Sequence, residues 1–246
     1  MYEVNGVQYD EGMNTQRNQQ VNNEKWNKDR NKTYRNYGAR NKNEQMEMAE
    51  QIYIVLDEHM QKALSFHEQL ADYFCFLGLQ GFKRKLEYQY MCECSGKRKL
   101  HHKYINLHQK LIPMRQVQNP QLIPRDWGNY TTDDVNDNVL PKYVRSAMEQ
   151  YKTWEHETKE LYEEQWQKCV DNGMVADAEY ITELVEDVTK EIKKINRMCE
   201  QLNGTGYDVM AIHNMQDKYH EKYKEKYNRM YTDKEFKKIK QKDKIK

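Results

Sequence analysis

Apolar residues recur at three- and four-residue steps over four segments of the chain, which is the pattern of amphipathic helices. Gly78 and Gly81 bracket the break between the first two segments, and Gly173 follows the third. Short connections between long helices make each pair of neighbours an antiparallel hairpin. The pattern predicts helices over residues 44–77, 82–112, 142–170 and 174–202.

The stretch from Pro113 to Pro141 has no sustained helical pattern and is long for a connection between packed helices. At ~3.3 Å per extended residue it can run the full length of a helix of about 30 residues, roughly 45 Å. The third helix can therefore begin at the same end as the second and run parallel to it. The sequence predicts an all-α fold, a four-helix bundle over residues 44–202 with one long crossover.

Two further segments flank this bundle. Residues 1–43 are rich in Asn, Gln, Lys, Arg and Tyr without apolar periodicity, so we expect a disordered polar arm. Residues 207–246 are expected to form an amphipathic helix and a basic tail. From Lys218 to Lys246 the net charge is +7, which can neutralise the phosphates of nucleic acid without reading its sequence. A solvated helix end is the competing interpretation.

Composition narrows the class of protein. Of the 246 residues, 37% are hydrophobic and 32% are charged, which suits one modest core with solvated tails. The net charge of +1 gives the whole molecule no general preference for nucleic acid or acidic membranes. No apolar run resembles a signal peptide or a membrane span. We therefore expect no membrane partner. The five cysteines form no disulfide-like framework, so we expect a cytoplasmic protein.

The phrase Phe66-His67-Glu68-Gln69-Leu70-Ala71-Asp72-Tyr73-Phe74, with the two hairpins and the crossover, resembles the ferritin-like superfamily of ferritins, rubrerythrins and Dps-like proteins. The resemblance covers roughly residues 46–202. It implies a bundle that holds a pair of iron ions, with a Glu from each of two helices and a Glu-x-x-His from each of the others. A homo-oligomer is a further expectation. The Asn-, Lys- and Tyr-rich composition also resembles ferritin-like proteins encoded by phages of low-GC bacteria.

Glu93 is the strongest candidate for a metal ligand. It lies seven residues from both Leu86 and Leu100, in the centre of an apolar stripe where a carboxylate needs a partner. Three residues on, where the family motif has a histidine, this chain has Gly96. Two interpretations stay open for Glu93, a metal ligand or a structural ion pair with Lys97 one turn away.

Four other residues complete the candidate site. Glu155 and Glu191 lie seventeen residues before and after the turn at residues 172–174, so an antiparallel hairpin places them at equal depth. His59 lies in the middle of the first apolar stripe and His67 at its flank. Three of the four have a structural alternative, since the glutamates also suit solvated edges of their helices and His59 suits a hydrogen-bonded core position.

Three functions therefore compete. The first is a ferritin-like protein with an incomplete metal site, weak or lost iron binding, and ferroxidase activity only if the site assembles. The second is a Dps-like bundle that binds nucleic acid through residues 218–246. The third is a virion- or partner-associated bundle without chemistry. An intact ferroxidase centre is disfavoured, because neither the second nor the fourth helix carries a complete Glu-x-x-His.

Overall fold

The computed structural model describes residues 42–113, 115–118 and 132–232, and most of them lie in five long helices. These helices are α2 (Lys42–Phe76), α3 (Gln80–His108), α4 (Leu140–Asp171), α5 (Val175–Gly204) and α6 (Val209–Thr232), and a short 3-10 helix, η2 (Thr132–Asp134), precedes α4. The described ranges contain no β-strand, which confirms the all-α prediction. Most of the predicted N-terminal arm, residues 1–41, and the end of the basic tail, residues 233–246, lie outside the described residues.

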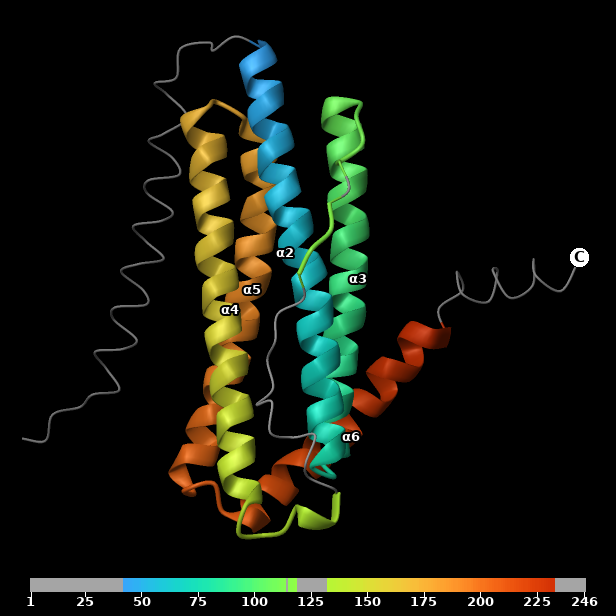
Figure 1. Cartoon of the computed structure of the whole chain (residues 1–246), viewed down its shortest axis with the longest axis vertical. Helices are drawn as coiled ribbons and strands as arrows, with labels where there is room; N and C mark the ends of the chain where they lie inside the picture. The colour runs from blue at the N-terminus through green and yellow to red at the C-terminus, as the bar shows by residue number, and fades with distance from the viewer. Residues whose placement is uncertain (1–41, 114, 119–131, 233–246) are drawn as a thin grey trace, which may run out of the picture.

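The helices form two antiparallel hairpins, α2 with α3 and α4 with α5 (Figure 1). Helix α4 begins at the end of the bundle where α3 begins, and the two run in the same direction. The connection from α3 to α4, of which residues 114 and 119–131 lie outside the described residues, therefore joins opposite ends of the bundle. This arrangement confirms the predicted four-helix bundle with one long crossover.

The apolar core is divided into two clusters along the bundle axis. One cluster surrounds the α2–α3 turn and includes Phe66, Phe74, Leu86 and Ile212, while the other lies toward the far end and includes Leu56. Between them, each of the four bundle helices contributes polar side chains to the interior: His59, His67, Lys85, Glu93, Glu155, Thr158 and Glu191. The middle of the bundle is thus a polar layer between two apolar ones.

Glycine ends α2 and α4 in the same way. Gly78 has a φ of +75° and Gly173 a φ of +69°, values that a residue without a Cβ adopts at no steric cost. The N–H of the following residue then reaches back to a carbonyl five residues earlier, from Leu79 to Phe74 at 2.8 Å and from Met174 to Cys169 at 2.9 Å. These are Schellman motifs, and they explain why both hairpin turns are short.

Helix α3 is shorter than predicted. It ends at His108 because Gln109 takes a left-handed conformation, with a φ of 56°, and its N–H bonds to Ile105. Leu111, which falls within the predicted range of residues 82–112, lies beyond the helix and is 76% exposed. The nearby Pro113 disfavours helical backbone in the residue before it, so the apolar spacing overestimated the helix.

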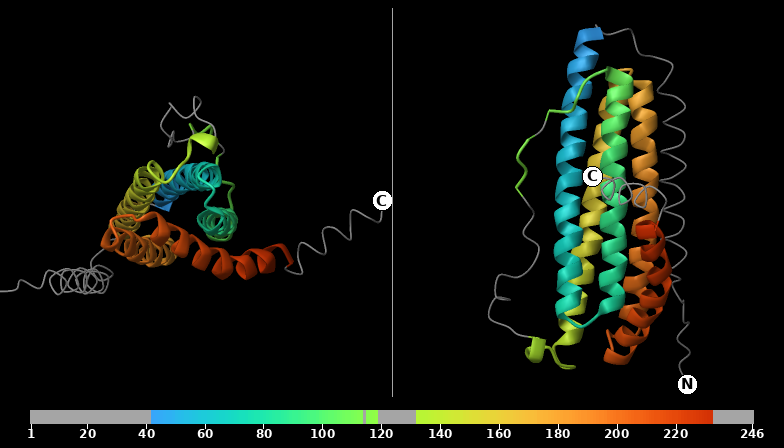
Figure 2. Two further views of the ribbon diagram at one scale, coloured as in Figure 1. Left: turned by 90° about the horizontal axis from the view of Figure 1, so that it is seen from below. Right: turned by 90° about the vertical axis from the view of Figure 1, so that its right-hand side faces the viewer.

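Gly81 has a different role from the one predicted. It lies in the first turn of α3 and not in the connection, and it marks the place where α6 crosses α3 (Figure 2). Its N–H donates to Gln216 Oε1 at 3.1 Å. A Cβ atom at Gly81 would lie 1.7 Å from the backbone oxygen of Gln216, so only glycine allows this approach. Aromatic contacts extend the packing, with Phe82 and Tyr219 ring centroids 5.8 Å apart.

We predict that Gly81→Ala weakens the docking of α6, because the backbone of α6 must move away from the new methyl group. The expected loss is about 1–3 kcal/mol of unfolding free energy, measured by urea denaturation, with faster proteolysis within α6. Gly96→Ala is the matched control on the same helix, since a Cβ there meets nothing within 4 Å. It should stabilise the protein by roughly 0.5–1 kcal/mol. Equal effects of the two substitutions would contradict the packing described here.

Candidate functional site

A cavity of about 260 Å³ lies in the polar layer, between α3 and the α4–α5 hairpin. Four carboxylates from three helices line it: Glu93 from α3, Glu155 from α4, and Asp187 and Glu191 from α5. Asp187 is exposed and pairs with Lys190 at 2.8 Å, so the other three are the inner carboxylates. Glu155 and Glu191 are each only 4% exposed. The interpretation of these two glutamates as solvated edge residues is therefore wrong, because the α4–α5 hairpin turns both toward the opposite pair of helices.

Glu155 faces His67 of α2. The distance between His67 Nε2 and Glu155 Oε1 is 3.5 Å, and both atoms are buried without a hydrogen-bond partner. His67 Nδ1 donates to the backbone oxygen of Ala63 at 2.9 Å, which leaves Nε2 directed at Glu155. The ring is held by Phe66 and Tyr151, whose planes are nearly perpendicular to it.

Glu93 is half-buried and accepts a hydrogen bond of 3.3 Å from Gln89 one turn earlier. Burial raises the pKa of the Glu93 carboxyl, and the negative charges of Glu155 and Glu191 raise it further, while His67 and Gln89 partly offset these effects. The suggested pair with Lys97 does not form. Lys97 Nζ lies instead 3.5 Å from Asp57 on α2.

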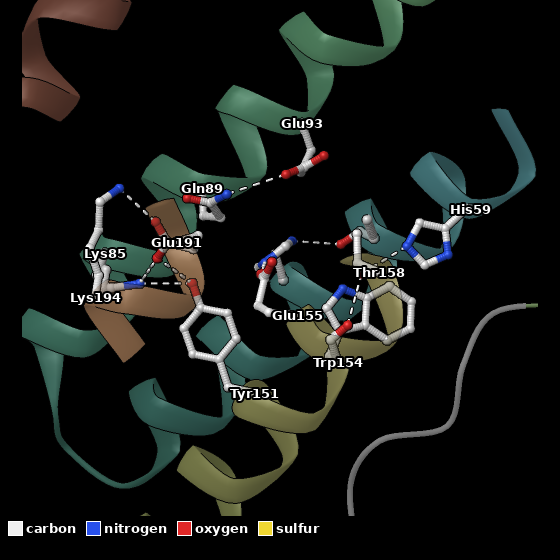
Figure 3. A network of polar contacts seen from close by, with 12 residues as sticks. His59, Lys85, Gln89, Glu93, Tyr151, Trp154, Glu155, Thr158, Glu191 and Lys194 are labelled. Atoms are coloured by element: carbon white, nitrogen blue, oxygen red, sulfur yellow. Dashed lines mark hydrogen bonds and ion pairs between the residues drawn. The ribbon is translucent and has the colours of Figure 1, made fainter. Parts of the chain in front are cut away.

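Glu191 is fully engaged by neighbouring side chains. Its Oε1 accepts from Lys85 at 2.6 Å and from Tyr151 at 3.0 Å, and its Oε2 accepts from Lys194 at 2.7 Å. Figure 3 shows the two lysines and Tyr151 gathered around this carboxylate. Burial alone would raise the pKa of Glu191, but attraction to Lys85 and Lys194 outweighs it and holds the pKa far below its ordinary value.

His59 lies beyond Thr158, away from Glu191 (Figure 3). The Thr158 hydroxyl donates to the backbone oxygen of Trp154 at 2.8 Å, so His59 Nε2 must be the donor in its 2.9 Å bond to Thr158. The imidazole also stacks on the Trp154 ring at 5.0 Å between centroids. Burial, followed by the positive charge of Lys62, lowers the pKa of His59 to about 4.

The position three residues after each cavity glutamate explains what the site lacks. Three residues after Glu93 stands Gly96, three after Glu155 stands Thr158, and three after Glu191 stands Lys194. None of these glutamates therefore begins a Glu-x-x-His motif. Over residues 42–113, 115–118 and 132–232, no three His, Cys, Asp or Glu side chains stand close enough together to hold a metal ion as they are.

The same arrangement of helices occurs in solved ferritins. An open-pore ferritin from the hyperthermophilic archaeon Archaeoglobus fulgidus matches with a TM-score of 0.56 at 15% identity, over 72% of this chain and 96% of that one. An engineered closed form of the A. fulgidus ferritin gives a TM-score of 0.55 at 16% identity, over 74% and 97% of the two chains. This chain has the ferritin fold.

A humanized archaeal ferritin matches equally well, with a TM-score of 0.56 at 15% identity, over 74% of this chain and 98% of that one. At such identities the likeness concerns the fold. No protein-family model and no curated protein matches the sequence. The likeness therefore assigns no ligand to this bundle.

Lys85 and Tyr151 are the residues of the site that the sequence analysis missed. Lys85 stands three residues after Phe82 and eight before Glu93, so helical spacing places it on the same face as both. The presence of a lysine on that face was the available signal. The apolar spacing of α4 marks Tyr151 only as a core position, because nothing in the sequence distinguishes its hydroxyl from that of any other tyrosine.

Two other buried carboxylates were also missed. His101 Nε2 lies 2.7 Å from Asp57 Oδ1, and His108 Nε2 lies 2.8 Å from Asp177 Oδ1, which also accepts from Tyr53 at 3.0 Å. These pairs join α3 to α2 and to α5. They engage two of the histidines near the end of α3 in contacts between helices.

In the part of the chain that the structure describes, no helix is long and apolar enough to cross a membrane. The basic segment begins on α6, where Lys222 and Lys226 are exposed and lie over the Tyr223 ring, at 5.5 and 5.3 Å from its centroid. Its last residues, 233–246, lie outside the described residues.

We predict that His59 makes the folded protein less stable in mild acid. Its pKa is about 4 in the fold and 6.5 unfolded, so the unfolded chain binds more protons between these values and stability falls as pH decreases. From pH 7 to pH 5 the loss due to this group is about 2 kcal/mol. His59→Phe should lower the pH dependence of urea unfolding by that amount. An imidazole NMR titration of His59 with a midpoint near 6.5 would contradict the assignment.

Proposed function

We propose that this ferritin-like bundle keeps an incomplete metal site. The site weakly binds a single divalent ion, such as ferrous iron, in place of a pair of ions. The facing pair of His67 and Glu155 carries this proposal. Both atoms that face each other, His67 Nε2 and Glu155 Oε1, are buried and lack hydrogen-bond partners. Buried polar atoms normally have a partner, so two unsatisfied atoms directed at each other beside a cavity favour a missing ligand.

The chemistry of the donors suits such an ion. An imidazole nitrogen and carboxylate oxygens are ligands that iron and similar divalent metals accept. Glu93 is the third donor we assign, because it lines the same cavity and interacts electrostatically with both His67 and Glu155. A bound cation would bring the pKa of Glu93 back down, since the ion binds the carboxylate form.

Two observations indicate that this site binds a metal ion weakly. Glu93 has to move before three donors converge, because no group of three in the described ranges is already placed to hold a metal. Glu191 and His59 are bonded to other side chains, Glu191 to Lys85 and His59 to Thr158. With one weakly held ion we expect iron oxidation to be slow or absent.

Substitution of each donor tests this proposal. Glu93→Ala should abolish bound iron while leaving helicity intact, because removal of a half-buried, poorly paired carboxylate need not destabilise the bundle. Glu155→Gln and His67→Ala should each weaken ferrous ion or cobalt(II) binding by more than about 100-fold, because loss of a group that only orients a ligand costs about 10–100-fold. Binding is measured by isothermal titration under anaerobic conditions.

His156→Ala is the matched control for these variants, since His156 is exposed on α4 next to Glu155. Its metal affinity should equal that of the wild type. The proposal fails if the parent protein binds no ion under any loading condition, or if Glu93→Ala keeps its iron.

A second candidate function is nucleic-acid binding by the basic segment. The described part of that segment supports it, because Lys218, Lys222, Lys224 and Lys226 are all exposed. Of these four, Lys224 forms an ion pair with a described carboxylate, at 4.0 Å from Glu221. Clustered exposed ammonium groups attract phosphates and release counterions on binding.

The test of this second function is DNA retardation at several salt concentrations. Removal of residues 233–246 deletes most of the lysines of the segment and leaves Tyr219 and Tyr223, which pack against α3, in place. Retardation should weaken and its salt dependence should become shallower. Unchanged retardation would exclude residues 233–246 as the binding site.

The remaining expectations stay predictions from the sequence. They are a homo-oligomeric assembly, a cytoplasmic location, ferroxidase activity, the virion- or partner-associated role and the phage origin.

A further inference from the structure

Lys85 is the one lysine that is buried among the described residues, with 2% of its surface exposed. Lysine is rarely buried without a counter-charge. Its Nζ lies 2.6 Å from Glu191 Oε1 and 2.7 Å from the Tyr151 hydroxyl, and 4.5 Å from the centre of the Tyr151 ring. The ammonium group is thus held inside the polar layer by one carboxylate and one aromatic ring.

The charges around the cavity divide into two unlike halves. On one side Glu191 has both oxygens engaged, Oε1 by Lys85 and Oε2 by Lys194. On the other side Glu155 has an oxygen without a hydrogen bond, and Glu93 has a single bond of 3.3 Å from an uncharged amide. Two lysines therefore neutralise the negative charge at Glu191, whereas Glu155 and Glu93 have no lysine partner and only the His67 imidazole and the Gln89 amide beside them.

We infer that Lys85 is an internal cation, which supplies to Glu191 the positive charge that a second metal ion would otherwise supply. Lys85 thereby sets the number of ions that the cavity takes. The inference concerns only Glu191 and Lys85. That the wild-type chain binds one ion rests on the function proposed above.

The geometry explains why a lysine does this. An ammonium is a compact point charge with three donors, and here one donor meets Glu191 while another meets Tyr151. A metal ion that approached Glu191 would have to displace Lys85 and leave a buried ammonium without its counter-charge. Lys194 contributes less to this exclusion, because its side chain is 52% exposed and can turn into solvent.

The test is the number of cobalt(II) ions bound by Lys85→Met, measured by equilibrium dialysis and by visible absorption of the bound ion. Methionine keeps a similar length without the charge, and Glu191 Oε1 becomes free to bind a cation. We expect Lys85→Met to bind one more ion per chain than the wild type. The matched control, Lys194→Met, keeps Lys85 in place and should bind the wild-type number.

The comparison separates this inference from the proposed function. One ion in the wild type and two in Lys85→Met supports both. None in the wild type and one in the variant removes the proposed function and supports the inference. The same number in both proteins, with the variant folded by circular dichroism, overturns the role of Lys85.

A second pair of variants covers the case in which Lys85→Met does not fold. Glu191→Gln leaves the buried ammonium uncompensated beside the cavity, so it should weaken the first ion by about tenfold or more through repulsion. The double variant Lys85→Met/Glu191→Gln carries neither charge and should recover wild-type affinity, because a neutral replacement of a buried pair is often tolerated. Wild-type affinity in Glu191→Gln, or no recovery in the double variant, would overturn the inference.

Discussion

Charge in the middle of this bundle has to be neutralised from within, and that constraint organises the polar layer. Five ionisable side chains from four helices meet there, at a level where water is largely excluded: His67, Lys85, Glu93, Glu155 and Glu191. Coulomb interactions are strong in such surroundings, and an unpaired charge is correspondingly unfavourable. The ammonium group of Lys85 neutralises Glu191, whereas His67 Nε2 and Glu155 Oε1 lack hydrogen-bond partners.

The rest of the architecture follows from keeping this layer closed. Two apolar clusters, one on each side of it, hold the four helices together, so the polar groups in between need not stabilise the bundle themselves. The crossover brings α3 and α4 parallel, which lets the hairpins face each other across the cavity. Helix α6 then covers part of α3, and its close approach at Gly81 adds buried aromatic surface.

The positions of the candidate ligands could be predicted only in part. Equal spacing from a tight turn placed Glu155 and Glu191 at one depth, and the structure places both in the same cavity. Their burial could not be read from the sequence, because both glutamates lie at the edges of their apolar stripes and such edges are usually solvated. The two histidines illustrate the same limit, since His59 and His67 lie on one helix but contact different partners, Thr158 and Glu155.

By itself, the sequence determined the helical class, the two hairpins and the crossover. These features follow from local chemistry, since apolar spacing sets the buried face of each helix, glycine sets the turns, and chain length decides which ends can meet. Only the tertiary structure decided which carboxylate has a counter-charge. Lys85 and Glu191 are 106 residues apart, and their contact depends on the rotation of α3 against α5, which packing of the whole bundle controls. A rotation of α3 about its own axis by one residue, about 100°, would bring a neighbouring side chain to Glu191 in place of Lys85. No local pattern in the chain encodes this rotation.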